Sequence, residues 1–295
     1  MIEALRYWLY GSHVLVLWGA ELRAAMPVNH CRDHRAVCSD EWVLYRVVRL
    51  DMTRATDKGS APARVPAGVA TAVVVAVLAV VNIAGHFLHG VLWLGPVAVV
   101  ALVCFARWTG LSWSQLGLST DQLWSGFRWG LGAVTVVAAA YLAGVLLPLT
   151  RSAFLDARYH LAVSGALLSA FVIIPVGTIF VEEVAFRSVL WGMLARQFTT
   201  WRVLGTSSAL FGLWHILPSL HLGSANQGVG HAVRGVGGWA TVLVVVASVG
   251  ITAIGGVVAG ALRHRSGSVL ASAGMHWATN ALGVLFGLLA WRLGG

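Results

Sequence analysis

Charged residues are scarce in this chain. They make up 11% of its 295 residues, whereas hydrophobic residues make up 58% and the mean hydropathy is +0.79. A soluble globular domain carries roughly 25% charged residues, so this composition excludes a soluble enzyme. Several windows of about 20 residues are almost wholly apolar, which is long enough to cross a bilayer as a helix. The sequence therefore predicts an all-α, polytopic transmembrane helical bundle.

Acidic residues and lysine are also few. The 11 acidic residues stand against 20 basic ones, which gives a formal net charge of +9, and Lys58 is the one lysine. The arginines lie near the ends of apolar segments, which predicts contact with a lipid bilayer and no nucleic-acid partner. A sequence rich in Arg, Ala, Val and Gly but poor in Lys is typical of a GC-rich bacterial genome.

Cysteine is too rare to provide a disulfide framework. The three cysteines are Cys31, Cys38 and Cys104, and they form no recognisable set of pairs. The spacing from His30 to Cys38 matches no standard Cys/His zinc site, so no zinc site is predicted there.

Apolar segments long enough to be helices recur along the chain after about residue 64. A short interfacial helix is expected over Ser112–Leu118, between the second and third segments. About seven spans are predicted, at 65–87, 91–106, 127–148, 161–196, 201–217, 239–261 and 267–291.

The chain is expected to divide at about residue 64. Residues 1–64 hold most of the acidic residues and are expected to form an N-terminal, cytoplasmic, partly flexible segment. Met52 is an alternative start, ahead of an ordinary flexible leader to the first membrane helix. Residues 65–295 are expected to form the transmembrane domain.

Basic residues predict the orientation of the spans. If the N-terminus is cytoplasmic, basic residues favour the cytoplasmic side by about fifteen to four. The opposite side receives only Arg151, Arg158, Arg234 and Arg292. We therefore expect a multi-pass protein of the plasma membrane with a cytoplasmic N-terminus.

Three ionisable residues interrupt the fourth apolar segment. Glu182, Glu183 and Arg187 lie within the run Phe180–Arg187. A charged side chain at membrane depth costs roughly 3 kcal/mol on insertion scales, so it needs a partner or a task. Glu183 and Arg187 are four residues apart and suit an ion pair, whereas Glu182 lies about 100° away around the helix. We interpret Glu183 and Arg187 as structural and Glu182 as the residue available for chemistry.

Two later segments carry polar residues at a similar depth. Phe211 and His215 are four residues apart on the fifth segment, and His276 and Asn280 are four apart on the seventh. At 1.5 Å per residue, Glu182, His215 and His276 lie about 21, 20 and 15 Å from the cytoplasmic ends of their helices. Because these three polar side chains come from three helices and lie at a similar depth in the membrane, we expect them to form one site.

Two chemistries are open to this set of residues, and both hydrolyse an amide. In the first, Glu182 with His215 activates a water, while His276 and Asn280 donate hydrogen bonds to the oxyanion of a tetrahedral intermediate. In the second, Glu182, His215 and His276 form a His₂Glu ligand set for a divalent metal such as zinc.

The three motifs resemble those of a known protease family. Glu182-Glu183-x-x-x-Arg187, Phe211-x-x-x-His215 and His276-x-x-x-Asn280, in this order on successive apolar helices, are similar to the motifs of the CPBP (Abi/CAAX protease and bacteriocin-processing) intramembrane endopeptidases. This family is related to the type II CAAX prenyl proteases.

The resemblance carries expectations of its own. It implies a protease core at about 160–291 with a catalytic cavity within the C-terminal helices, and a membrane-embedded or membrane-associated peptide as substrate. It implies Glu182 as the base, His215 as its partner, and His276 with Asn280 as oxyanion stabilisers. Family members are named metalloproteases, while a metal-free glutamate mechanism has been argued for relatives, so the cofactor stays open.

Two other functions compete with the protease. A non-catalytic bacteriocin-immunity or scaffolding protein of the same family would keep the polar cluster only to bind a partner. A small transporter would use Glu182 and Glu183 as a proton relay, but such proteins usually contain inverted repeats or broken helices, and neither is evident here.

Overall fold

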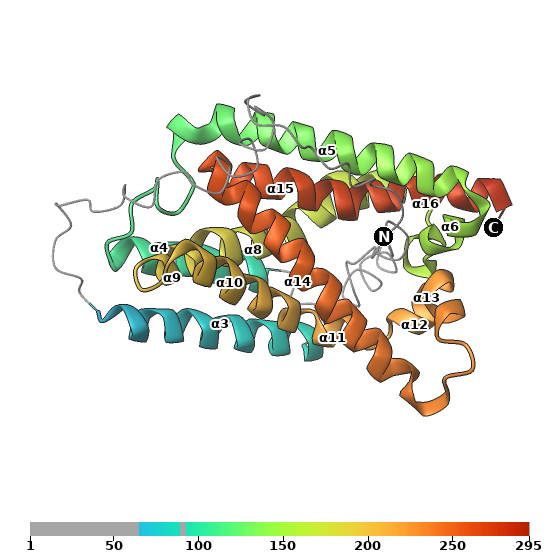
Figure 1. Ribbon diagram of the computed structural model, residues 1–295, viewed down its shortest axis with the longest axis horizontal. Coiled ribbons are helices and arrows are strands. Elements are labelled where there is room, and N and C mark those ends of the chain that lie inside the picture. Colours follow the sequence, from blue (N-terminus) through green and yellow to red (C-terminus); the bar gives the residue numbers. More distant parts are fainter. Residues whose placement is uncertain (1–64, 89–92, 295) are drawn as a thin grey trace, which may run out of the picture. The chain divides into compact units, whose positions relative to one another are not determined.

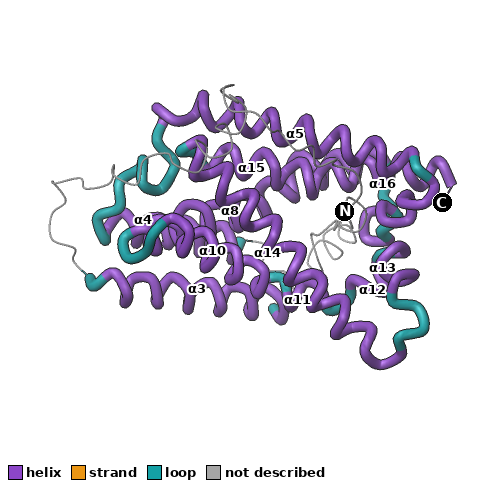
Figure 2. The backbone as a smooth tube through the Cα atoms, viewed as in Figure 1, coloured by secondary structure: helices purple, strands orange, loops and turns teal. Residues whose placement is uncertain are grey.

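The computed structural model describes residues 65–88 and 93–294. No strand occurs among these residues, and Asp156 and Asn226 form an isolated β-bridge. The all-α helical bundle is therefore confirmed for the described part of the chain (Figure 1, Figure 2). The predicted segment 1–64, with Cys31 and Cys38, lies outside it.

Helices account for most of the described chain. The longer ones are α3 (Ala67–Phe87), α4 (Leu94–Trp108), α5 (Leu123–Leu146), α10 (Thr200–Trp214), α14 (Ala240–Ser266), α15 (Val269–Trp277) and α16 (Gly283–Gly294). The short ones are η1 (Thr120–Gln122), α6 (Pro148–Arg151), η2 (Ser152–Phe154), η3 (Ala157–Tyr159), α7 (Val163–Leu168), η4 (Ser169–Ile173), η5 (Pro175–Ile179), α8 (Phe180–Glu183), η6 (Val184–Leu190), α9 (Trp191–Ala195), α11 (Ile216–Ser219), α12 (Leu222–Ala225), α13 (Gln227–Ala232), η7 (Gly237–Trp239) and η8 (Ala278–Leu282).

Fewer helices reach membrane-spanning length than the sequence predicted. Among the described residues, five are long and apolar enough to cross a bilayer, and a bent pair would make a sixth. The second predicted span corresponds to α4, which has only 15 residues. A multi-pass membrane protein is therefore supported, but the count of seven spans is not confirmed. The five are Ala67–Phe87, Thr120–Leu146, Val163–Ala195, Gly237–Ser266 and Val269–Gly294.

The fifth predicted span is the bent pair. Thr200–Trp214 and Ile216–Ala225 meet at an angle of 45°, with His215 at the break. Pro218 lies four residues after Trp214, so it cannot donate a backbone hydrogen bond to the Trp214 carbonyl, and its ring crowds that carbonyl. Proline is a standard cause of such kinks. The bend therefore follows from the local sequence.

The helix that carries the two glutamates is not a regular α-helix. The π-helical segments η4, η5 and η6 alternate with short α-helical turns between Ser169 and Leu190. Pro175 contributes to this pattern because it has no backbone N–H to donate. A second π-helical segment, η8, follows His276 directly. Wide turns of this kind occur often at functional sites, and here they adjoin two of the three motifs.

Small residues allow the motif-bearing helices to pack closely. A Cβ atom on Gly212 of α10 would lie 2.6 Å from the Val249 carbonyl oxygen of α14, which leaves no room for a side chain. On Gly274 of α15, it would lie 3.0 Å from Cα of Gly130 on α5. Such contacts are typical of helix packing in membranes. They lie three residues before His215 and two before His276, so they bring both imidazoles into the bundle.

Hydrogen bonds join the loops at one end of the bundle. The Val269 backbone N–H donates to the Gly117 carbonyl at 3.0 Å, and Arg263 donates to the Gln115 carbonyl at 3.0 Å. Arg196, in the turn after α9, donates to the Thr109 carbonyl at 2.7 Å, so this turn is also joined to the loops at this end. This end carries most of the arginines of the described chain.

The prediction of an interfacial helix at Ser112–Leu118 is wrong. Residues 113–117 form turns, in which the Ser112 N–H donates to the Gln115 side chain and the Gln115 N–H donates to Ser112. Gly117 adopts a φ of +70°, which ends any helix there and suits glycine.

Candidate active site

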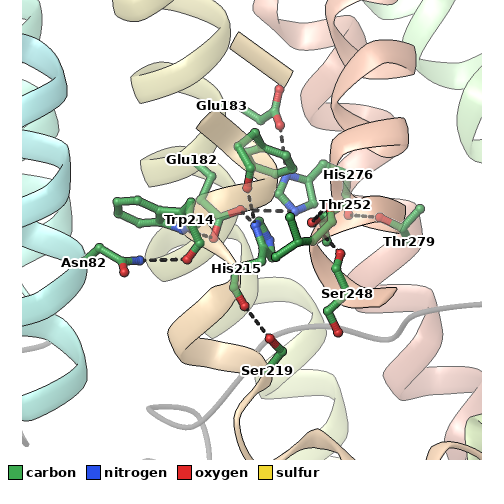
Figure 3. Close-up of polar contacts among 12 residues, drawn as sticks. Asn82, Glu182, Glu183, Trp214, His215, Ser219, Ser248, Thr252, His276 and Thr279 are labelled. Atoms are coloured by element: carbon green, nitrogen blue, oxygen red, sulfur yellow. Dashed lines mark hydrogen bonds and ion pairs between the residues drawn. The ribbon is translucent and has the colours of Figure 1, made fainter. Parts of the chain in front are cut away.

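Glu182 is the centre of a buried polar cluster at the break between α10 and α11. Its Oε2 atom lies 3.7 Å from Nε2 of His276 and 3.9 Å from Nε2 of His215. Both imidazoles and the carboxylate are buried, with 1–7% of each residue exposed. In Figure 3 the three side chains point toward one another from three separate helical segments. The structure therefore brings together the three residues that depth alone grouped in the sequence.

The hydrogen bonds of the two imidazoles fix which nitrogen carries the proton in the neutral ring. Nδ1 of His215 lies 2.6 Å from the Phe211 carbonyl oxygen, which can only accept, so this nitrogen donates. Nδ1 of His276 lies 2.9 Å from Oε1 of Glu183, and it donates to that carboxylate. In each neutral ring, the Nε2 atom that faces Glu182 is then an acceptor.

Glu183 and Arg187 form the ion pair that their spacing predicted. Nη1 of Arg187 lies 3.3 Å from Oε1 of Glu183, and both side chains are almost completely buried. Phe211 completes this part of the site, because its ring centroid lies 3.8 Å from the Arg187 guanidinium carbon. A cation over an aromatic face is stabilised electrostatically, particularly away from water.

Phe211 also contacts both imidazoles. Its ring centroid lies 4.6 Å from that of His215 and 6.0 Å from that of His276, with edge-to-face geometry. These contacts restrict the orientation of both rings. The site-supporting role predicted for Phe211 agrees with this arrangement, although its contribution to catalysis stays a prediction.

Asn280 is buried on η8, one turn after His276. Its predicted role as an oxyanion donor therefore rests on its position along the helix and on the motif.

Trp214 is a site residue that sequence analysis missed. Its indole Nε1 donates to Oε1 of Glu182 at 3.1 Å, so it holds the oxygen that does not face the imidazoles. The backbone carbonyl of Trp214 accepts a hydrogen bond from Nδ2 of Asn82 on α3 at 3.0 Å. A lone amide in an apolar helix was the available signal for Asn82, whereas nothing in the pattern distinguished Trp214 from an ordinary apolar residue.

The predicted metal ligands are the same three residues. Glu182, His215 and His276 have the donor chemistry of a His₂Glu zinc site. Within the described part of the chain, however, no group of three His, Cys, Asp or Glu side chains is arranged to hold a metal ion. The side chains as placed therefore do not fit a bound metal.

Comparison with known proteins agrees with the motifs. Residues 164–282 match the family model described as type II CAAX prenyl endopeptidase Rce1-like. Searches of curated proteins and of solved structures found no match. The matched segment contains all three motifs and every residue of the polar cluster around Glu182. This segment of the chain is therefore similar to the Rce1-like CAAX endopeptidases, in agreement with the family that its three motifs resemble.

Proposed function

We propose that this chain is an intramembrane endopeptidase that hydrolyses a peptide bond of a membrane-associated protein or peptide, using a water activated by Glu182 and His215. One observation carries the proposal. Oε2 of Glu182 is buried and has no hydrogen-bond partner within the described chain, and it faces both Nε2 atoms at 3.7–3.9 Å. These separations exceed a direct hydrogen bond. They leave all three atoms within reach of one water.

The chemistry begins with that water. Glu182 accepts one proton as the water oxygen bonds to the carbonyl carbon of the substrate, and Nε2 of His215 accepts a hydrogen bond from the other. The electron pair of the carbonyl moves onto its oxygen. When the C–N bond breaks, the leaving nitrogen takes the proton from Glu182, and the products are a carboxylic acid and an amine.

His276 and Asn280 are the proposed donors to the oxyanion. Because Nδ1 of His276 already donates to Glu183, its Nε2 can donate only when the ring carries both protons. Glu183 is therefore part of this proposal as the acceptor that holds the ring in place. The Asn280 amide can donate in any protonation state of the site.

An apolar pocket next to the site suits a substrate that arrives through the bilayer. It has a volume of about 330 Å³ and is lined by residues of α3, η6, α10 and α11, among them Leu78, Phe186, Leu213 and Trp214. Trp214 belongs to both the pocket wall and the hydrogen bond to Glu182. We propose that an apolar part of the substrate occupies this pocket while the scissile bond lies at Glu182.

The test is a cleavage assay on purified protein in phospholipid vesicles. The substrates are internally quenched peptides that end in a CAAX sequence, with and without a farnesyl group, and a library of apolar peptides. We expect Glu182→Gln and His215→Ala to lose at least about a hundredfold in kcat, the usual contribution of a general base. Asp121→Asn is the matched control, because it neutralises an exposed carboxylate away from the site.

Two results would contradict the proposal. Equal cleavage by the wild type and both variants would exclude Glu182 and His215 as the catalytic pair. Peptide binding without cleavage by any form would favour the non-catalytic immunity or scaffolding alternative. Comparing the farnesylated with the unmodified peptide shows whether the lipid group is required.

A further inference from the structure

Asn82 is a polar side chain in the apolar helix α3, which lies outside the segment matched by the family model. Its side chain reaches across to α10, where Nδ2 donates to the Trp214 carbonyl oxygen at 3.0 Å (Figure 3). A side-chain amide at membrane depth is costly without a partner. The hydrogen bond to the Trp214 carbonyl gives the amide that partner. The position of this bond, at the end of α10, suggests what the amide does.

The Trp214 carbonyl needs a donor that its own helix cannot supply. In a continuous α-helix it would accept a hydrogen bond from the backbone N–H of residue 218, but that residue is Pro218 and has no N–H. No bulk water is available in the hydrocarbon region to satisfy the carbonyl instead. The Asn82 amide supplies the missing donor from a different helix.

The end of α10 held in this way carries two groups of the site. The indole of Trp214 donates to Oε1 of Glu182 at 3.1 Å, and the next residue is His215. The other side of the break is held by Ser219, whose hydroxyl donates to the His215 carbonyl at 2.6 Å. The His215 carbonyl also keeps its ordinary helical donor, the Ser219 backbone N–H at 3.2 Å, whereas the Trp214 carbonyl receives its hydrogen bond from Asn82.

We propose that Asn82 is a positioning residue: it replaces the backbone donor that Pro218 lacks and thereby holds Trp214 and His215 in place around Glu182. The geometric part of this proposal is independent of catalysis. Only its effect on turnover rests on the endopeptidase function proposed above. The two parts are therefore tested by separate measurements.

The geometric part is tested by NMR of the indole N–H groups in full-length protein labelled with ¹⁵N-tryptophan in detergent micelles. The Trp214 resonance is assigned by its loss in Trp214→Phe. We expect Asn82→Leu to shift or broaden this resonance, because the indole no longer has a fixed position relative to Glu182. An unchanged Trp214 resonance in Asn82→Leu would overturn the proposal.

Thr71→Val is the matched control for this measurement. Thr71 also lies on α3 and also takes part in a hydrogen bond to another part of the chain, since Gln197 donates to its hydroxyl at 2.7 Å. It lies 11 residues before Asn82, about 16 Å along the helix. We expect Thr71→Val to leave the Trp214 resonance where it is in the wild type.

A second variant tests the reason for the hydrogen bond. Pro218→Ala restores a backbone N–H at residue 218, so in combination with Asn82→Leu it should bring the Trp214 resonance back toward its wild-type position. Pro218→Ala alone, in which Asn82 still donates to Trp214, is the control that shows what loss of the proline does by itself. If Pro218→Ala adds to the disturbance instead, the role as a replacement donor is wrong.

The effect on turnover is measured with the quenched peptides. We expect Asn82→Leu to lower kcat by about ten- to a hundredfold, because a small displacement of a catalytic group has this effect. Asn82 also lines the pocket proposed for the substrate, so the proposal is tested by kcat at saturating peptide and not by KM. The same double variant should recover part of kcat. If the wild type cleaves peptides and Asn82→Leu matches its kcat, the proposed effect on catalysis is wrong even though the endopeptidase function stands.

Discussion

Glu183 accepts a hydrogen bond from Nδ1 of His276 at 2.9 Å through the same oxygen that pairs with Arg187. Helical spacing predicted the partner four residues away but not the imidazole 93 residues away in the sequence. The adjacent carboxylate of Glu182 approaches the other nitrogen of the same ring, at 3.7 Å. His276 thus lies between two consecutive glutamates, and Glu183 joins a structural ion pair to the proposed catalytic groups.

This arrangement predicts different costs for substitutions at the two glutamates. Glu183→Gln and Arg187→Ala each leave a buried charge without its partner, so we expect each to destabilise the fold by about 3–5 kcal/mol. Glu182→Gln removes a carboxylate that has no ion-pair partner of this kind and should retain normal expression. The difference in stability is measured by heating each variant in detergent and quantifying the protein that stays folded by size-exclusion chromatography.

The double variant Glu183→Gln/Arg187→Met is the control for this prediction. It removes both charges together, so it should be more stable than Arg187→Ala alone, because no unpaired charge stays in the core. Wild-type unfolding temperature and expression in Arg187→Ala would contradict the assignment of this pair to stability.

Much of the fold and the identity of the motif residues could be predicted from the sequence. Apolar length located five of the spans, and the intervals around Glu182, His215 and His276 placed them at one depth. The fifth predicted span, 201–217, ends just before Pro218, but the bend of 45° at His215 was not predicted.

What could not be predicted depends on local geometry or on contacts between distant segments. Seven membrane spans were predicted, and α4 does not support the second of them, because its 15 residues are fewer than a span needs. The π-helical turns beside Glu183 change which groups a given residue faces, so an α-helical wheel could not show that both glutamates approach His276. The hydrogen bonds of Trp214 and Asn82 could not be predicted, because each joins helices that are far apart in the sequence.

Trp214 should contribute to catalysis through its hydrogen bond to Glu182. Trp214→Phe keeps an aromatic ring in the pocket wall but removes the donor to Oε1. A hydrogen bond to a charged group contributes about 1.5–3 kcal/mol. We therefore expect kcat to fall by about ten- to a hundredfold, measured with the quenched peptides in vesicles.

Trp239→Phe is the matched control for Trp214→Phe, because Trp239 is exposed at the start of α14. It should cleave like the wild type. An equal kcat for Trp214→Phe and the wild type would show that the orientation of Glu182 does not depend on the indole.

The orientation in the membrane is a separate prediction from the arginine distribution. The turn that contains Thr199 and Arg196 should face the cytoplasm, and the segment that contains Ser224 should face the opposite side. In a protein whose three cysteines are replaced by serine, Ser224→Cys should react with a membrane-impermeant maleimide in intact cells. Thr199→Cys should react only after lysis. The reverse pattern would invert the proposed topology.

Metal removal gives the last prediction. Among the described residues, no group of three His, Cys, Asp or Glu side chains is arranged to hold a metal ion, and a carboxylate with an adjacent imidazole is sufficient to activate a water. We therefore expect prolonged treatment with a strong chelator to leave kcat unchanged, with no stoichiometric metal found by elemental analysis. Metal content is also measured in Glu182→Gln. If Glu182 were a metal ligand, this variant would bind less metal than the wild type as well as being less active. If chelation abolishes cleavage, zinc restores it, and Glu182→Gln fails to retain the ion, then Glu182, His215 and His276 move into a ligand set in the working enzyme.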